Sequence, residues 1–303
     1  MAKKQFILIM TDSQRRDMIS SCNERGENMH TPCLDRLCDE GLAFNSAYTT
    51  QPVCGPARAG LFTGTYPHTN GMLGNCMALS QQSLTIGQRL SRAGIHAAYI
   101  GKWHLDGGDY FGDGICPDGW DEEYWYDMRN YLDELESDKD RERSRKLETA
   151  LEGEGIGEEF TYGYHCTKRA LDFMEKHKDE DYFLVVSYDE PHHPFLAPKS
   201  YYEPFYKPYL QKANQHMDFS KLPDHIKVWH EKYMEIQGGN GDGCAVGLLG
   251  SNSFIDSQIG RVLDGAEKNA EEALVLYTSD HGDAQGSHGI HAKGPAMYEE
   301  ITN

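Results

Sequence analysis

Apolar residues gather in short continuous runs, which are typical of strands buried on both faces of a parallel sheet. Three such runs lie in segments 6–12, 182–188 and 273–283, and a shorter one begins at residue 99. Helical patterns occupy the intervals. Residues 31–41 combine a capping threonine, a proline at the first helical position, spaced apolar residues and a final glycine, and residues 84–93 and 254–270 are similar. The alternation predicts an α/β fold in which helices flank a doubly wound, mostly parallel sheet.

A chain of 303 residues suits one large domain, 1–303, and two insertions interrupt its alternation. The first, 107–163, contains a charged run, 138–145, that is typical of a solvated helix face. Its aromatic residues would line a substrate pocket or form a local apolar core; they include Trp120, Tyr124, Trp125 and Tyr126. The second, 199–243, is aromatic and ends in the glycine-rich segment 238–241, which favours a lid. Its aromatic residues include Tyr201, Tyr202, Phe205, Tyr206 and Tyr209.

The formal net charge of −19 disfavours nucleic acid and anionic membranes as partners. The eight cysteines include no CxxC pair, which disfavours a disulfide framework or a zinc site and suits reduced thiols. No apolar run approaches the length of a membrane span, and the run after Lys4 is too short for a signal peptide. The sequence therefore predicts a cytoplasmic protein.

Polar residues with metal- or anion-binding potential follow the predicted strands. Asp12 ends the first strand, and Asp280 ends the last with His281 beside it. Ligands of open α/β sheets gather at the carboxyl ends of strands. After the shorter run, Lys102 and His104 would share one face of an extended segment and reach the same anion. A solvated lysine beside a structural histidine is the alternative explanation.

The run at residues 54–64 is the most specific motif. A Gly/Pro turn, Arg58 and a series of small residues follow Cys54, which predicts a reactive side chain at a helix N-terminus, where anions bind well. A turn with one buried thiol is the alternative. These residues resemble the signature of type I sulfatases, Cys-x-Pro-x-Arg followed by Thr-Gly, with Ala57 in place of the commoner serine.

Other stretches resemble further motifs of this family in the required order. They are the strand end at Asp12, the Gly-Lys-x-His run at 101–104, the loop with His192, the pair Asp280 and His281, and the segment 291–294 with Lys293. The chain is thus similar to the formylglycine-dependent sulfatases of the alkaline-phosphatase-like superfamily. This resemblance implies a sulfuric ester hydrolase whose Cys54 is oxidised to formylglycine by a sulfatase-maturing enzyme.

The resemblance also implies a divalent cation, usually Ca²⁺, with Mn²⁺ or Mg²⁺ as alternatives. Its ligands would be Asp12, Asp280, His281 and the modified Cys54. The family usually carries Asp or Gln directly after the first aspartate, whereas this chain has Ser13 followed by Gln14. The remaining ligand would come from Ser13, Gln14 or Asp17, or from a water molecule.

Family roles for the other site residues follow in the same way. Arg58 would orient the hydrated aldehyde, and Lys102 and Lys293 would bind the sulfate oxygens. The departing alcohol would receive its proton from His192 or Lys293. His104 would accept the proton that lets sulfate leave and the aldehyde reform. The expected substrate is a small sulfate ester of a sugar, an aryl group or a choline-type alcohol.

Two alternatives share these residues. A phosphonate monoester or phosphodiester hydrolase would use the same nucleophile and cation, because the basic cluster accepts either tetrahedral anion. A non-catalytic remnant would bind sulfate or metal without turnover. The resemblance implies a C-terminal subdomain with a small antiparallel sheet, which is absent up to Asn303. The sequence is then either a fragment or a short form with an exposed sheet edge that favours pairing with another chain, so a homo-oligomer is a further expectation.

Overall fold

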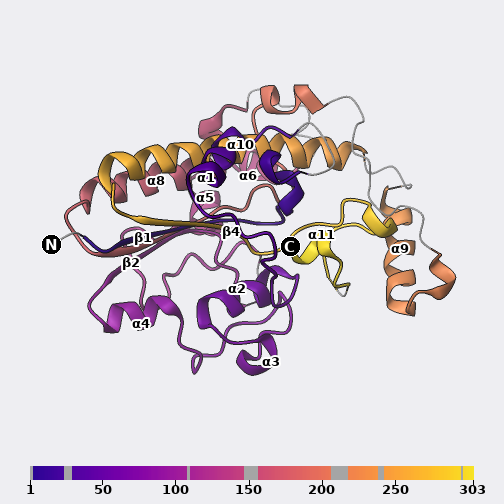
Figure 1. Cartoon of the computed structure of the whole chain (residues 1–303), viewed down its shortest axis with the longest axis horizontal. Helices are drawn as coiled ribbons and strands as arrows, with labels where there is room; N and C mark the ends of the chain where they lie inside the picture. Colours follow the sequence, from indigo (N-terminus) through magenta and orange to yellow (C-terminus); the bar gives the residue numbers. More distant parts are fainter. Residues whose placement is uncertain are drawn as a thin grey trace.

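The computed structural model describes residues 3–23, 29–107, 110–146, 156–205, 218–237, 242–294 and 296–303. Its centre is a four-stranded parallel sheet in the order β2-β3-β1-β4 (Figure 1). The strands are β1 (Gln5–Thr11), β2 (His96–Gly101), β3 (Tyr182–Ser187) and β4 (Leu274–Ser279). Ser187 is in register with both Gly101 and Met10, and Met10 with Thr278. The carboxyl ends of all four strands therefore meet at one edge.

Helices cover both faces of this sheet (Figure 1). The first face carries α1 (Pro32–Glu40), α5 (Met128–Glu134), α6 (Asp138–Arg143), α8 (Tyr162–Lys176) and α10 (Asp242–Asn269). The second carries α2 (Cys54–Thr63), α3 (Pro67–Asn70) and α4 (Ile86–Arg92). Toward the C-terminus lie α9 (Asp224–Gln237) and α11 (Glu299–Thr302). This arrangement confirms the predicted α/β fold with its doubly wound parallel sheet.

Alternate residues of the strands supply two separate cores, because successive side chains point to opposite faces. Ile7 and Ile9 pack into the cluster that contains Phe173 of α8 and Ile259 of α10. Leu8 and Met10 pack on the other face; their cluster includes Ala59, Phe62, Trp103, Trp120 and Trp125. Each face thus holds its helices by apolar burial, and the strand ends stay fixed relative to α2.

The predicted helices differ from the observed ones mainly in length. The pattern predicts a helix at 254–270, whereas α10 begins at Asp242. Its first part contains glycines that weaken the helical pattern in the sequence. Tertiary packing compensates for them: the Phe195 ring lies where a side chain at Gly247 would point, and the Tyr202 ring lies against Gly250.

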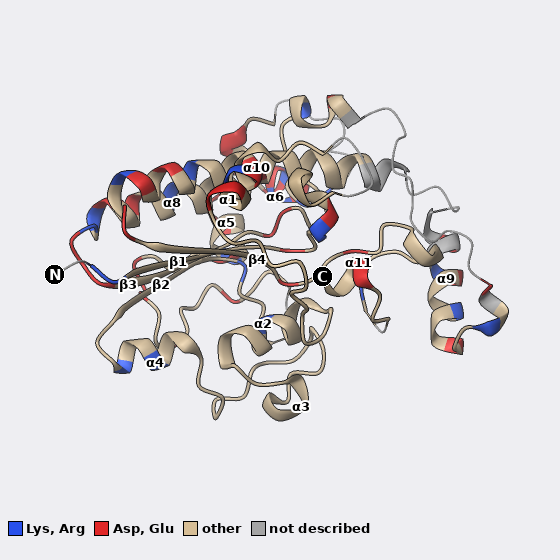
Figure 2. Ribbon diagram, in the orientation of Figure 1, with Lys and Arg blue, Asp and Glu red and all other residues tan. Residues whose placement is uncertain are grey.

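The aromatic residues of the first insertion belong to the main core. Trp120 and Trp125 pack on one face of the sheet, and Tyr124 and Tyr126 pack on the other. The charged run forms α6, whose residues are exposed or half-buried, and Figure 2 likewise shows acidic and basic residues along α8.

Part of the second insertion lies outside the described residues, including Tyr206, Tyr209 and segment 238–241, and with it the proposed lid. Within the described part, Tyr201 and Tyr202 pack with Phe254. β4 is an edge of the described sheet, where Leu274 is 66% exposed. Among the helices that the structure describes, none combines the length and apolarity needed to cross a bilayer.

Candidate active site

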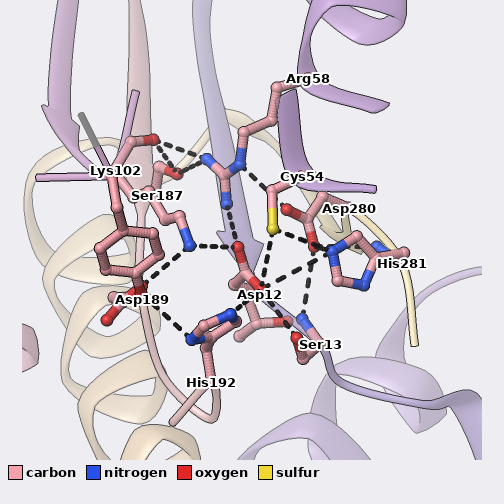
Figure 3. A network of polar contacts seen from close by, with 12 residues as sticks. Asp12, Ser13, Cys54, Arg58, Lys102, Ser187, Asp189, His192, Asp280 and His281 are labelled. Atoms are coloured by element: carbon pink, nitrogen blue, oxygen red, sulfur yellow. Dashed lines mark hydrogen bonds and ion pairs between the residues drawn. The ribbon is translucent and has the colours of Figure 1, made fainter. Parts of the chain in front are cut away.

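The strand ends deliver polar side chains to one network of polar contacts (Figure 3). Asp12 directly follows β1, Lys102 follows β2, and Asp280 follows β4. Gly101 permits the turn into Lys102, because its φ is +117° and a Cβ there would lie 1.8 Å from the Ser187 carbonyl oxygen. Cys54 is the first residue of α2, at the helix N-terminus that its motif predicts, and its side chain joins the same network.

The centre of this network consists of the side chains of Asp12, Cys54, Asp280 and His281. The Sγ atom of Cys54 lies 3.2 Å from His281 Nε2 and 3.8 Å from Asp12 Oδ1. His281 Nε2 is 3.6 Å from Asp280 Oδ1 and 3.8 Å from Asp12 Oδ1. One donor atom from each of the four residues lies within 4.8 Å of the others, and all four residues are buried. This donor set could hold a metal ion.

The structure separates the candidates for the remaining ligand. The Ser13 hydroxyl lies 2.8 Å from Asp12 Oδ1 and within 3.2 Å of Lys293 Nζ, so it belongs to the central cluster. The Gln14 amide instead donates to Asn252 Oδ1 at 2.6 Å and accepts from the Tyr277 hydroxyl. Asp17 pairs with the Arg15 guanidinium. Only Ser13, of these three, places its side chain against the clustered carboxylates.

Arg58 connects both carboxylates to the strand ends. Its Nε donates to Asp280 Oδ2 at 2.9 Å, and Nη2 lies 3.4 Å from Asp12 Oδ2. Nη1 donates to the Lys102 carbonyl oxygen at 2.6 Å and to Ser187 Oγ at 2.7 Å. The side chain is fully buried, and its fork of donors fixes the relative positions of these groups.

Two lysines approach the centre from different segments. Lys102 Nζ lies 2.7 Å from Asp12 Oδ2 and 3.0 Å from Asp189 Oδ1. Lys293 Nζ lies 3.7 Å from Asp12 Oδ1. Both cations therefore border the carboxylate that contacts the Cys54 thiol.

Of the other two histidines named from the sequence, His192 lies beside Asp12 and His104 lies beside Tyr110. His192 Nδ1 is 2.8 Å from the His193 carbonyl oxygen, and its Nε2 is 4.0 Å from Asp12 Oδ1. His104 is buried, and its Nδ1 has no hydrogen-bond partner among the described residues. Its ring packs edge-on against Tyr110, with 5.5 Å between centroids. Of the candidate ligands, Gln14 and Asp17 thus point to other partners, whereas the remaining predicted site residues lie in one region.

The surrounding charges lower the pKa of Asp12 and Cys54, whereas the pKa of Asp280 is raised. Burial has the largest effect on the pKa of Asp12 and raises it, but Lys102 and Lys293 bring this pKa well below its ordinary value. Burial and Asp12 raise the pKa of the Cys54 thiol, yet the same lysines and His281 bring it well below its ordinary value. Burial and Asp12 raise the pKa of Asp280 to about 7. Burial lowers the pKa of His281, but Asp280 reverses this effect and raises it to about 9.

The sequence did not predict the residues that contact Lys102 and His192 from outside the central network. Asp189 accepts from the Tyr110 hydroxyl and pairs with Lys102, and its Oδ2 lies 3.5 Å from Arg145 Nη1. The Tyr110 hydroxyl also lies 3.1 Å from His192 Nδ1. Asp189 follows a predicted strand closely, which is a usable signal. Tyr110 and Arg145 lie in the first insertion, where no periodicity indicates their position.

Comparisons with known proteins agree with this geometry. The sulfatase family model matches residues 4–303. Over its whole length the chain is 41% identical to YidJ, an uncharacterised sulfatase of Escherichia coli (strain K12), and covers 62% of that protein. It is 26% identical to PehA of Trinickia caryophylli, a multifunctional alkaline phosphatase superfamily protein, with 97% of this chain and 66% of PehA covered.

Solved structures show the same fold. The phosphonate monoester hydrolase of Agrobacterium radiobacter superposes with a TM-score of 0.78 at 19% identity, over 99% of this chain and 66% of that one. The chain thus spans between 62% and 66% of the length of these relatives. The family model, the identity to YidJ and the fold together show that this chain belongs to the sulfatase family of the alkaline phosphatase superfamily.

Proposed function

We propose that this chain hydrolyses a sulfate monoester to an alcohol and sulfate, with Cys54 matured to formylglycine. The observation that carries the proposal is the position of Cys54. It is buried at the start of α2, and its Sγ contacts both Asp12 and His281. A nucleophile there is surrounded by cations that suit an anionic ester, since Lys102 and Lys293 both border Asp12.

The donor set fits a divalent cation. Asp12 and Asp280 offer carboxylate oxygens, His281 offers Nε2, and the Ser13 hydroxyl lies beside Asp12. A set dominated by oxygen suits a hard ion, so we assign Ca²⁺, with Mn²⁺ or Mg²⁺ as alternatives. When bound, such an ion supplies Lewis-acid polarisation and lowers the pKa of a hydroxyl nucleophile. Arg58 would hold the two carboxylates in place around it.

Lysine and histidine side chains would bind the sulfate group and transfer protons during the reaction. Lys102 and Lys293 would bind the sulfate oxygens, and burial makes each ion pair stronger than it is in water. Either Lys293 or a protonated His192, whose Nε2 lies 4.0 Å from Asp12 Oδ1, would donate a proton to the departing alcohol. His104, with its unpartnered Nδ1, would accept the proton that accompanies sulfate release.

Turnover of an aryl sulfate tests this function. The protein is produced together with a sulfatase-maturing enzyme, and Cys54→Ala is compared with Cys166→Ala, a second buried cysteine that lies in α8. We expect Cys54→Ala to abolish turnover and Cys166→Ala to retain it, while circular dichroism shows that both variants are folded. Turnover that survives Cys54→Ala would refute the proposal. Binding of sulfate without turnover by the matured protein would favour a non-catalytic role.

A phosphonate monoester or phosphodiester hydrolase is the second candidate, because the same lysines, arginine and metal donors accept either tetrahedral anion. Rates with an aryl sulfate and an aryl phosphodiester, measured on one matured preparation, separate the two. The proposed alcohol is a sugar, an aryl group or a choline-type alcohol. We also propose a reducing cytoplasmic environment, since the cysteines of the described residues form no disulfide.

A further inference from the structure

A second group of metal-binding side chains lies at the opposite end of the sheet from Cys54. His96 is the first residue of β2, and Lys102 follows the other end of that strand. His177 ends α8, and Glu180 lies in the turn that leads into β3. The group therefore joins an edge strand, a covering helix and the neighbouring strand, near the amino ends of the strands (Figure 1).

The Glu180 carboxylate lies between the two imidazoles. Its Oε1 is 3.0 Å from His177 Nδ1, and its Oε2 is 3.1 Å from His96 Nδ1. The two rings are 4.6 Å apart and nearly perpendicular. One donor atom from each of the three residues lies within 4.8 Å of the others. Both histidines are partly exposed and the Glu180 side chain is 50% exposed, so an ion can enter from solvent.

His96 carries a feature of metal-bound histidines. Its Nε2 lies 2.5 Å from Asp121 Oδ2, while Nδ1 faces Glu180. A neutral imidazole carries one N–H, so only one of these nitrogens donates to its carboxylate. If Nε2 donates the proton to Asp121, the Nδ1 lone pair is available to a metal ion beside Glu180. A histidine that binds a metal usually donates its other ring N–H to a carboxylate in this way.

We propose that His96, His177 and Glu180 form a second metal site, which takes a borderline divalent cation, with Zn²⁺ as the best fit. Two imidazoles and one carboxylate suit zinc better than calcium, and a water molecule would complete four ligands. The half-exposed Glu180 side chain can adjust its position so that the donors reach zinc bonds of about 2.0–2.2 Å. Asp121 orients His96 and does not bind the ion. The site would tie the edge strand β2 to the end of α8.

The test counts Zn²⁺ bound per chain by equilibrium dialysis. Cys54→Ala serves as the parent protein, because the candidate active site also has zinc donors. We expect the further change Glu180→Gln, or His96→Gln, to remove one bound equivalent relative to this parent. Glu175→Gln, an exposed change of equal charge on α8, should leave the count unchanged. Asp121→Asn should weaken binding by about 10–100-fold without removing a ligand.

An unchanged Zn²⁺ count after Glu180→Gln would overturn the proposal, provided that circular dichroism shows the variant to be folded. A parent that binds no Zn²⁺ would overturn it as well and assign the cluster to ion pairs between protonated histidines and carboxylates. Added Zn²⁺ should also raise the unfolding temperature of the parent and of Glu175→Gln by more than that of Glu180→Gln. An equal rise in Glu180→Gln would contradict the site.

Discussion

Replacement of Arg58 by methionine should destabilise the protein strongly. The guanidinium is fully buried and lies 2.9 Å from Asp280 and 3.4 Å from Asp12. Methionine fills similar space but leaves both carboxylates without this partner. Removing one member of a buried ion pair typically costs about 3–5 kcal/mol, because the remaining charge stays desolvated. The variant also loses two hydrogen bonds, to the Lys102 carbonyl oxygen and to Ser187 Oγ.

Urea denaturation followed by circular dichroism measures this loss as the difference in free energy of unfolding. The control is Arg36→Met, because Arg36 pairs with Asp264 and Glu267 at the surface. Surface pairs contribute about 0–1 kcal/mol, so the control should change little. Saturating Ca²⁺ should reduce the difference in free energy of unfolding between Arg58→Met and wild type. A bound cation would neutralise the same two carboxylates. A loss for Arg58→Met no larger than that of Arg36→Met would refute the reasoning.

Three further predictions concern the cation, a helix start and pH. Added Ca²⁺ should raise the unfolding temperature of wild type, and Asp280→Asn should abolish that rise; an equal rise in the variant would exclude Asp280 as a ligand. Asp256→Ala should lower the free energy of unfolding by about 1–3 kcal/mol, because the Cys33 and Leu34 N–H groups at the start of α1 lose their carboxylate acceptor. An unchanged midpoint of urea denaturation would contradict this. Burial raises the pKa of Glu300, but backbone N–H groups and His288 outweigh it and hold the pKa below 4.5. The ionised Glu300 therefore stabilises the fold above about pH 4.5, and the stability difference between wild type and Glu300→Gln should shrink as the pH falls through the folded pKa; a constant difference would refute this.

The sheet was predictable because each strand is an apolar run followed closely by a polar residue, although β4 is an edge strand with exposed leucines. Asp12 and Asp280 follow their strands directly, so the common edge of a parallel sheet brings them together. The start of α10 was not predictable, since its glycines weaken the helical pattern and only the packing of Phe195 and Tyr202 accounts for them. The packing of Trp120 and Trp125 onto the sheet likewise depends on contacts distant in sequence.

The centre of the site was predictable from motifs, but its supporting contacts were not. Cys54 and Arg58 lie in one signature, and the fold places them as that signature implies. The sequence left Ser13, Gln14 and Asp17 open as candidate ligands, and only their side-chain contacts separate them. Tyr110 reaches Asp189 from an irregular insertion, so no local spacing indicates the contact. His96 and His177 carry no metal-binding spacing either, because their proximity arises from the packing of α8 on β2.

The proposed chemistry depends on the oxidation state of Cys54. The measurement is the mass of the peptide that contains Cys54, from protein made together with an active sulfatase-maturing enzyme. We predict that the thiol is replaced by an aldehyde, which reacts with a hydrazide probe, while the buried Cys166 keeps its thiol in the same sample. An intact thiol at Cys54, in a preparation where a known substrate of the maturing enzyme is fully converted, would contradict the formylglycine mechanism.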